Sequence, residues 1–152
     1  MKIYVQCDEG CFPYEYENGD LVDLWNKETV TLKKGESKKL LLGVRMKIPK
    51  GFKANLVPRS STFDKYHITL TNSPGQIDST YCGPDDEWKA NVEAKRDTTI
   101  PAGVRVFQFE IVPSMKANIF QKLKWLFTSR VKFVEVEKLK NKNRNGFGSS
   151  GN

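Results

Sequence analysis

The sequence predicts an all-β fold in one domain, and three observations support this prediction. The chain has 152 residues, a common size for one domain and enough to enclose a hydrophobic core. Up to about residue 112, short segments rich in β-branched and aromatic residues recur at nearly even spacing. Turn sequences with Gly or Pro separate these segments, which is typical of a sandwich, jelly roll or barrel.

The expected strands alternate polar with apolar side chains or are short apolar runs. In chain order they are residues 2–6, 28–32, 43–48, 53–57, 67–71, 105–112 and, near the end, 131–137. Three of the intervening turns, at residues 32–35, 48–51 and 100–103, end in glycine. Glycine adopts a positive φ without a steric penalty, so these turns are expected to reverse the chain.

Helix is expected in only two places. A short helix at residues 60–66 would begin at a serine N-cap. A longer helical insertion is expected near residues 116–128, because apolar residues recur there at intervals of three to four. They are Ile119, Phe120, Leu123, Leu126 and Phe127. Such a face either packs on its own domain or binds a partner, and the sequence leaves both possibilities open.

The end of the chain, residues 140–152, is polar and rich in Gly, Asn and Ser. It buries too little surface to order itself, so we expect a domain at residues 1–139 and a flexible arm at 140–152. Phe147 lies between two glycines in this arm, and Arg144 precedes it. These residues would suit stacking on a base and binding to phosphate, although a frayed end has the same composition.

Composition and charge narrow the class of protein. With 38% hydrophobic and 28% charged residues, the chain is expected to be globular, and no run approaches the ~18 apolar residues of a membrane helix. The first residues lack the apolar region of a secretory signal, so we expect a cytoplasmic location and no membrane contact. The net charge of +7 suits an anionic partner. The basic run at 138–144 lacks interleaved aromatic residues, so no direct nucleic-acid binding is expected.

The cysteines are expected to be free thiols. Cys7 and Cys11 have the spacing of half a zinc site, but no second pair follows, and His67 is the only histidine. Cys82 leaves an odd total of three, so a disulfide framework is not expected either.

Two segments carry the chemistry. Pro58-Arg59-Ser60-Ser61 combines a fixed bend with a guanidinium and hydroxyls, which suits phosphate oxygens but also fits an exposed turn. Downstream, Asn72 is followed by Gly75-Gln76-Ile77-Asp78 and by Tyr81-Cys82-Gly83. This second segment resembles the third motif of the trimeric dUTPases, G-x-I-D-x-x-Y-x-G.

The other motifs of that family are matched in the same order. Pro58-Arg59-Ser60 resembles the second motif, and Gly103-Val104-Arg105-Val106-Phe107-Gln108 is similar to the fourth. Gly19 to Leu24 resembles a degenerate first motif, in which an Asp-Leu pair remains. Arg144 to Gly151 is similar to the fifth, although two residues shorter between Arg and Phe. The resemblance therefore covers nearly the whole chain and is that of a phage or prophage dUTPase.

This resemblance implies a jelly-roll homotrimer whose active sites lie between subunits and hydrolyse dUTP to dUMP and pyrophosphate with Mg²⁺. Asp78 would be the general base that activates water, although an aspartate there could also cap a turn. Tyr81 would place its ring under the deoxyribose and exclude a ribose, unless it is a core residue. The backbone of Gly75 to Ile77 and the amide of Asn72 would read the uracil edge.

The resemblance also implies which residues bind the phosphate chain. Arg59, Ser60, Ser61 and Gln108 would hold it, and Mg²⁺ would be carried on the triphosphate with few protein ligands. Asp23 would touch the metal through water or have a structural role. The arm would contribute the last group of contacts to the γ-phosphate and uracil, from Arg144, Phe147, Gly148 and Ser149.

Two alternatives of different kinds remain. A dCTP deaminase shares the fold and the Arg-Ser-Ser sequence, but its base chemistry uses a glutamate, whereas Asp78 and Tyr81 fit the dUTPase pattern. Alternatively, a dUTPase-like protein could bind a repressor as a regulatory partner through residues 116–128. The second role is compatible with catalysis.

Overall fold

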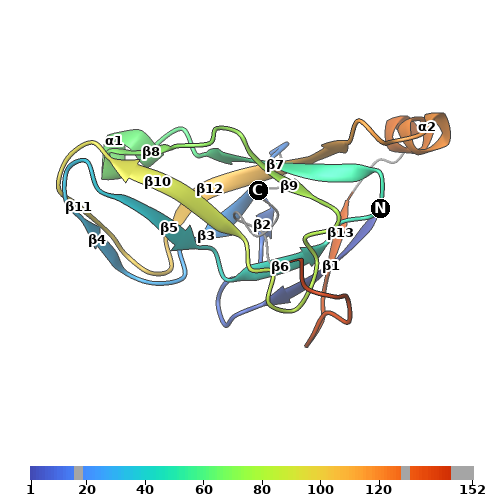
Figure 1. Ribbon diagram of the computed structural model, residues 1–152, viewed down its shortest axis with the longest axis horizontal. Helices are drawn as coiled ribbons and strands as arrows, with labels where there is room; N and C mark the ends of the chain where they lie inside the picture. The colour runs from blue at the N-terminus through green and yellow to red at the C-terminus, as the bar shows by residue number, and fades with distance from the viewer. Residues whose placement is uncertain (16–18, 128–130, 145–152) are drawn as a thin grey trace.

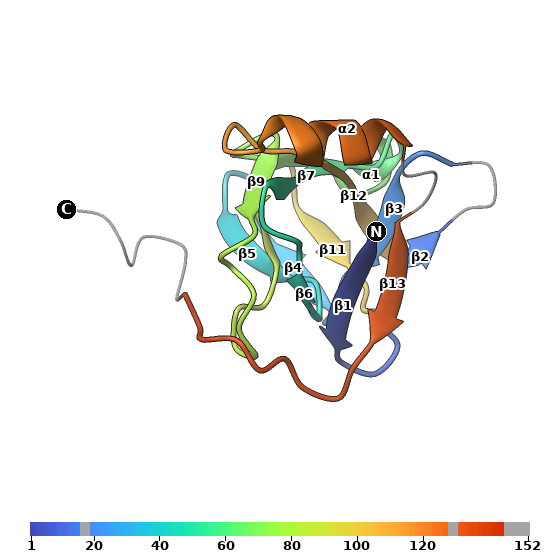
Figure 2. The same cartoon turned by 90° about the vertical axis from the view of Figure 1, so that its right-hand side faces the viewer.

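The computed structural model describes residues 1–15, 19–127 and 131–144. Most of its elements are short strands, arranged as in Figures 1 and 2. They surround one apolar core. The elements are, in chain order, β1 (Lys2–Cys7), β2 (Tyr14–Glu15), β3 (Val22–Trp25), β4 (Val30–Leu32), β5 (Ser37–Leu41), β6 (Val44–Lys47), β7 (Phe52–Pro58), α1 (Thr62–Tyr66), β8 (Ile68–Leu70), β9 (Gly75–Asp78), β10 (Lys89–Ala94), β11 (Thr98–Ile100), β12 (Arg105–Pro113), α2 (Ile119–Phe127) and β13 (Lys132–Glu135). The expectation of an all-β protein is therefore confirmed.

The largest sheet has five strands in the order β2-β3-β12-β7-β9. Smaller sheets of order β13-β1-β6, β5-β10-β8 and β11-β4 complete the wall around the core. Strands that are neighbours in a sheet are often distant in sequence, as in a jelly roll. The helix α2 lies at one end of the molecule and the β4–β11 pair at the other (Figure 1).

Large side chains from several sheets meet in the core. Trp88, Phe107 and Phe109 are completely buried. The ring of Phe109 makes edge-to-face contacts with Trp88 at 5.1 Å and with Phe133 at 5.8 Å between centroids. Such contacts stabilise the fold beyond the burial of apolar area, and they join β12 to β13 and to the start of β10.

The expected turns and helices are present, with changes in detail. Gly35, Gly51 and Gly103 have φ values of 81°, 89° and 71°, as their turns require. The short helix spans Thr62–Tyr66, and Ser61 occupies its N-cap without a side-chain capping bond. Because Ser61 has helical φ and ψ of −86° and −2°, the expected serine cap is absent.

The end of the described chain returns to the domain. β13 pairs in parallel with β1, and the segment after it runs beneath the domain to the loop between β9 and β10 (Figure 2). Within the described residues, no helix is long and apolar enough to cross a membrane.

Candidate active site

Three of the sequence motifs meet on adjacent strands. Asp23 on β3 lies opposite Gln108 on β12, and Gln108 lies opposite Val57 on β7. Arg59 follows β7 directly, so this row of residues places it beside Asp23. The first, second and fourth motifs therefore form one cluster, which we call the Arg59 cluster: Asp23, Arg59, Ser60, Ser61 and Gln108.

Asp23 is the buried residue of the Arg59 cluster, with only 1% of its surface exposed. Its carboxylate oxygens lie 3.1 Å from Arg59 Nε and 3.6 Å from Arg105 Nη1. The Arg105 guanidinium also lies over the Tyr14 ring, 4.5 Å from its centroid. A buried carboxylate requires such positive partners, so the main contacts of Asp23 are with the two arginines.

The segment after β7 is fixed to β12 through its backbone. Arg59 N–H and the Thr62 hydroxyl both donate to the carbonyl of Val106, at 3.2 Å and 2.6 Å. Gln108 donates to the Pro58 carbonyl at 3.4 Å. Ser60 is exposed at the outside of this bend. Its hydroxyl is thus presented on a segment whose position is well defined.

The third motif lies on the other side of β7. β9 pairs with β7 and is the edge strand of the sheet. Gly75 is buried, Ile77 is half-buried, and Asn72 is exposed on the preceding turn. An edge strand leaves half of its backbone N–H and C=O groups unpaired by the sheet, so this edge can present them to a flat polar ligand.

Asp78 ends β9 and is held on both carboxylate oxygens. One oxygen accepts the Thr80 backbone N–H at 2.9 Å and the Thr80 hydroxyl at 2.5 Å, and the other pairs with Arg144. Burial raises the pKa of Asp78, but the hydrogen bonds from Thr80 and the Arg144 charge outweigh it and lower the pKa. The carboxylate is therefore ionised at neutral pH.

Tyr81 is 8% exposed, and its hydroxyl donates to the Glu87 carbonyl at 2.8 Å. Burial raises the pKa of Tyr81 to about 12, with further contributions from the charges of Asp86 and Glu87. In one chain the tyrosine is thus packed like a core residue, with its orientation fixed by a hydrogen bond at the ring tip.

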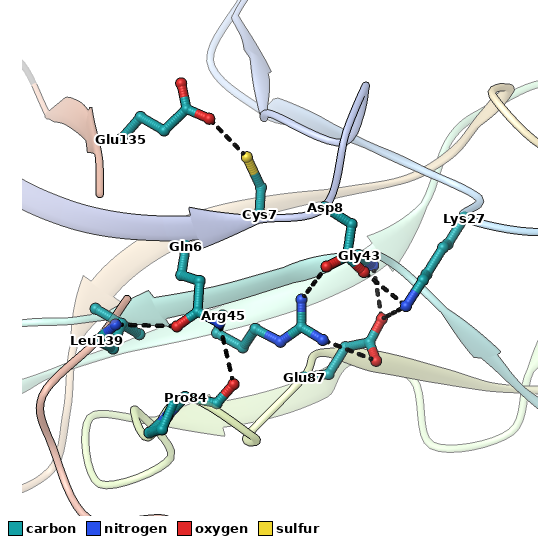
Figure 3. A network of polar contacts seen from close by, with 10 residues as sticks. All are labelled: Gln6, Cys7, Asp8, Lys27, Gly43, Arg45, Pro84, Glu87, Glu135 and Leu139. Carbon is teal, nitrogen blue, oxygen red and sulfur yellow. Dashed lines mark hydrogen bonds and ion pairs between the residues drawn. The ribbon is translucent and has the colours of Figure 1, made fainter. Parts of the chain in front are cut away.

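A charged network supports the loop that carries Tyr81 (Figure 3). The Glu87 carboxylate accepts the Gly43 N–H at 3.0 Å and lies 3.4 Å from Arg45 and 3.5 Å from Lys27. Asp8 completes the network, 2.7 Å from Arg45 and 2.6 Å from Lys27. Each charge in this partly buried cluster therefore has a partner of opposite sign, and removal of one partner would leave the other charge uncompensated.

Asp78 and the Arg59 cluster lie far apart in one chain. Asp78 is opposite Lys53, at the start of β7, whereas Arg59 follows Pro58, at its end. Strands rise about 3.3 Å per residue, so roughly 17 Å of β7 separates them. A single chain therefore does not bring Asp78 and the Arg59 cluster to the same reacting atom.

The remaining expected site residues divide into two cases. Arg144 is described and contacts Asp78. Phe147, Gly148 and Ser149 lie outside the described residues. Sequence reasoning gave no individual role to three residues that position the site: Thr80 beside Asp78, Arg105 beside Asp23, and Asp86 beside Arg144. Two of them had a local signal. Arg105 belongs to the fourth motif, and Thr80 stands two residues after Asp78, where a hydroxyl can bond the carboxylate.

The fold and the candidate site define the class of protein as an all-β domain of jelly-roll type, with an arginine and serine cluster at one end of β7 and an aspartate on the edge strand β9. A family model described as dUTPase matches residues 12–151. The chain belongs to the dUTPase family.

Individual relatives agree with this assignment. The SPbeta prophage-derived deoxyuridine 5'-triphosphate nucleotidohydrolase YosS of Bacillus subtilis is 42% identical over 135 residues, which is 89% of this chain and 86% of that protein. The deoxyuridine 5'-triphosphate nucleotidohydrolase of Crocosphaera subtropica is 34% identical and covers 99% of this chain and 98% of its own. A mutant dUTPase from a Staphylococcus aureus phage, phi11, has the same fold, with a TM-score of 0.67, 20% identity and coverage of 77% and 94%.

Proposed function

We propose that the protein hydrolyses dUTP to dUMP and pyrophosphate, assisted by Mg²⁺. The match of the dUTPase model to residues 12–151 carries this proposal, because it includes the aspartate, tyrosine and arginine expected to act. The curated relatives are named as deoxyuridine triphosphate nucleotidohydrolases. We place the enzyme in the cytoplasm of the host cell, which the similarity to a prophage-derived relative supports.

Asp78 would act as the general base. It accepts a proton from water as the water oxygen attacks the α-phosphorus. The bond from the α-phosphorus to its bridging oxygen breaks, and pyrophosphate leaves with the bonding electrons. The two hydrogen bonds from Thr80 to one carboxylate oxygen support this role, because they fix the carboxylate and leave the second oxygen to Arg144 or a water.

The Arg59 cluster would bind the triphosphate. Arg59 donates to phosphate oxygens from a guanidinium that Asp23 holds, and Ser60 lies near the oxygen between the α and β phosphates. The Ser61 backbone and the Gln108 amide provide further donors. Arg144 would meet the γ-phosphate. Phe147, Gly148 and Ser149, known from the sequence alone, would close over the uracil and phosphates.

Mg²⁺ would be brought by the nucleotide. Within the described ranges, no three His, Cys, Asp or Glu side chains are grouped to hold a metal. A magnesium ion that keeps several waters and binds phosphate oxygens needs few protein ligands, so the residues fit this arrangement. Asp23 would reach the ion only through water. The ion neutralises charge that develops on the leaving pyrophosphate.

The protein would act as a homotrimer with shared sites. The separation of Asp78 from Arg59 by roughly 17 Å of strand supports this arrangement, because the two must approach the same substrate. A site between subunits would bring Asp78 of one chain to the Arg59 cluster of another.

One assay tests the function directly. Pyrophosphate release should be measured from dUTP and from the four common dNTPs, with and without Mg²⁺, together with ammonia release from dCTP. We expect pyrophosphate from dUTP alone, at a rate that depends on Mg²⁺. Ammonia from dCTP would instead identify the related deaminase.

Tyr81 provides a test of sugar selection. If its ring excludes a 2′-hydroxyl, Tyr81→Ala should raise kcat/KM on UTP relative to dUTP by roughly 1 to 3 kcal/mol. Tyr81→Phe keeps the ring and removes the hydroxyl that bonds the Glu87 carbonyl, so its discrimination should stay close to that of the parent. An unchanged UTP to dUTP ratio in Tyr81→Ala would leave the tyrosine a core residue.

A second function is favoured by the outer face of α2. Trp125 packs on Phe52 at 5.6 Å, and Gln121 donates to the Lys50 carbonyl at 2.8 Å. The opposite face is largely exposed and apolar, which is typical of a partner surface. It consists of Ile119, Phe120, Leu123, Leu126 and Phe127. We propose that this face binds a regulatory protein and that this binding coexists with catalysis.

A variant of the exposed face separates the two functions. Phe120→Ser with Leu126→Ser should keep dUTPase activity and trimer size, because neither side chain supports the domain. It should abolish capture of a host or phage regulator by the tagged trimer, tested with and without dUTP. Lys122→Ser, on the same helix, serves as the control. Loss of trimerisation in the double variant would show that a second subunit covers the face.

A further inference from the structure

A tyrosine and an arginine approach β3 from its two sides, next to the Arg59 cluster. β2 is the edge strand beside β3, and Tyr14 on β2 lies opposite Asp23 (Figure 2). On the other side of β3, Arg105 on β12 lies opposite Trp25. A shift in register at this point of β12 produces the pairing with Trp25, as β-bulges do when they re-aim a side chain.

The Arg105 guanidinium lies in a corner formed by two rings. Its central carbon is 4.5 Å from the centroid of the Tyr14 ring and 5.4 Å from that of Trp25. The two rings are nearly perpendicular, at 78°, with their centroids 6.3 Å apart. A guanidinium at these distances is attracted by the partial negative charge on the ring faces. We call Tyr14 and Trp25 the aromatic corner.

The aromatic corner is fixed to the domain at Trp25. The indole Nε1 donates to the Phe12 carbonyl at 2.8 Å, and this bond joins β3 to the segment that leads into β2. Tyr14, in contrast, is 43% exposed. Removal of its ring should therefore leave the fold intact while it changes the surroundings of Arg105.

Arg105 connects the aromatic corner to the Arg59 cluster. Its Nη1 lies 3.6 Å from the buried Asp23 carboxylate, which in turn lies 3.1 Å from Arg59 Nε. Arg59 Nη1 also donates to the Arg105 carbonyl at 3.4 Å. Asp23 thus lies between two guanidinium groups. A displaced Arg105 would leave this buried carboxylate with less compensating charge and would shift the residue that holds Arg59.

We propose that Tyr14 and Trp25 are positioning residues for the triphosphate: they hold Arg105 beside Asp23, and Asp23 in turn orients Arg59 toward the phosphate oxygens. The ring contacts use the flat face of the guanidinium, so the N–H groups at its edge serve acceptors such as the Asp23 carboxylate. This inference rests on the proposed dUTPase function, because the phosphate chain is the ligand assigned to the Arg59 cluster. Each ring acts through Arg105 and not by contact with the nucleotide.

Substitution of Tyr14 tests the positioning role. Tyr14→Leu removes the ring and should raise KM for dUTP by about three- to tenfold with little change in kcat, because contacts to the phosphates form before the chemical step. Tyr14→Phe keeps the ring face and should behave like the parent. Tyr4→Leu, which removes a 41% exposed tyrosine ring from β1, is the control and should have parental kinetics.

The pattern of kinetic change separates positioning from general damage. A partly unfolded variant has fewer active sites, so its apparent kcat falls at an unchanged KM. That result in Tyr14→Leu would overturn the proposal, as would a parental KM. The effect should also be equal for dUTP and UTP, because both carry the same triphosphate. A changed UTP to dUTP ratio would place the action of Tyr14 at the sugar and would also overturn the proposal.

A double variant tests whether the aromatic corner acts through Arg105. In an Arg105→Met background, Tyr14→Leu should cause no further rise in KM, because the cation that the ring holds is already absent. Losses that multiply would contradict this route. If Arg105→Met fails to fold, the second ring provides the test: Trp25→Leu should raise KM as Tyr14→Leu does, and Trp25→Phe should recover most of the loss.

Binding of inorganic tripolyphosphate, measured by calorimetry, tests the same cluster without catalysis. The parent and Tyr14→Phe should bind it alike, and Tyr14→Leu should bind it about three- to tenfold more weakly. Equal binding by all three, or no binding by the parent, would overturn the proposal even where the parent hydrolyses dUTP. A parent that releases no pyrophosphate from dUTP would overturn the proposed function, while tripolyphosphate binding would still decide the role of the aromatic corner.

Discussion

Asp78→Asn is expected to lower kcat by about 10²-fold to 10⁴-fold while dUTP binds nearly as well as to the parent. Asparagine has almost the same shape and still accepts hydrogen bonds from Thr80, but it takes no proton from water. The side chain is 49% exposed, so its replacement should hardly change the melting temperature. Single-turnover hydrolysis and equilibrium binding of dUTP separate the two effects.

The outcome depends on the charge of Asp78 as well as on its shape. Loss of the carboxylate also removes one partner of the Arg144 guanidinium, so the affinity for dUTP is expected to rise slightly. More than about a tenth of the parental activity would be too much for a variant that lacks its general base. In that case Asp78 would only cap the turn at Thr80.

Two truncations of the arm are expected to differ in a way that the structure defines. Removal of residues 141–152 takes away Arg144 and Phe147, and should cost about 2 to 4 kcal/mol in kcat/KM. Removal of residues 145–152 keeps Arg144, whose backbone is bound to Asp86, and takes away Phe147 and the serines, so we expect a smaller loss of about 1 to 3 kcal/mol.

Thermal melting provides the control for these truncations. The chain that ends at residue 140 loses the hydrogen bonds of Asn143 to Asp85 and of Arg144 to Asp86, so its melting temperature should fall. The chain that ends at residue 144 keeps these hydrogen bonds and should melt like the parent. Both should remain trimers. Full activity in the chain that ends at residue 140 would exclude the arm from the mechanism.

The sequence predicted the fold class and the strands β1, β4, β6, β7, β8, β12 and β13. It missed β2, β3, β5, β9, β10 and β11. Of these, β5 and β10 contain Lys, Asn, Glu and Ala, residues with low β-propensity. These strands pair with each other from Lys89 opposite Leu41 to Glu93 opposite Ser37. Burial of one face of that pair decides their conformation, and this cannot be read from either segment alone.

The candidate site shows the same limit. Asp78, Arg59 and Tyr81 were found because short motifs carry them in a fixed local pattern. The contacts that position them join distant parts of the chain: Asp86 and Arg144 are 58 residues apart, and Asp23 meets Arg59 across three strands. Such pairs follow from the topology of the sheets, so a pattern along one segment does not reveal them.

The parallel pairing of β1 with β13 has a consequence for how the chain folds during synthesis. Lys2 lies opposite Lys132, so the first strand gains this neighbour only after nearly the whole chain has left the ribosome. Contacts between residues so distant in sequence make folding slow, because a long loop must close before they form. Until then β1 has one open edge, which is available to other nascent chains. Overproduction of the protein should therefore favour aggregation at this edge, and slower synthesis should increase the yield of folded trimer.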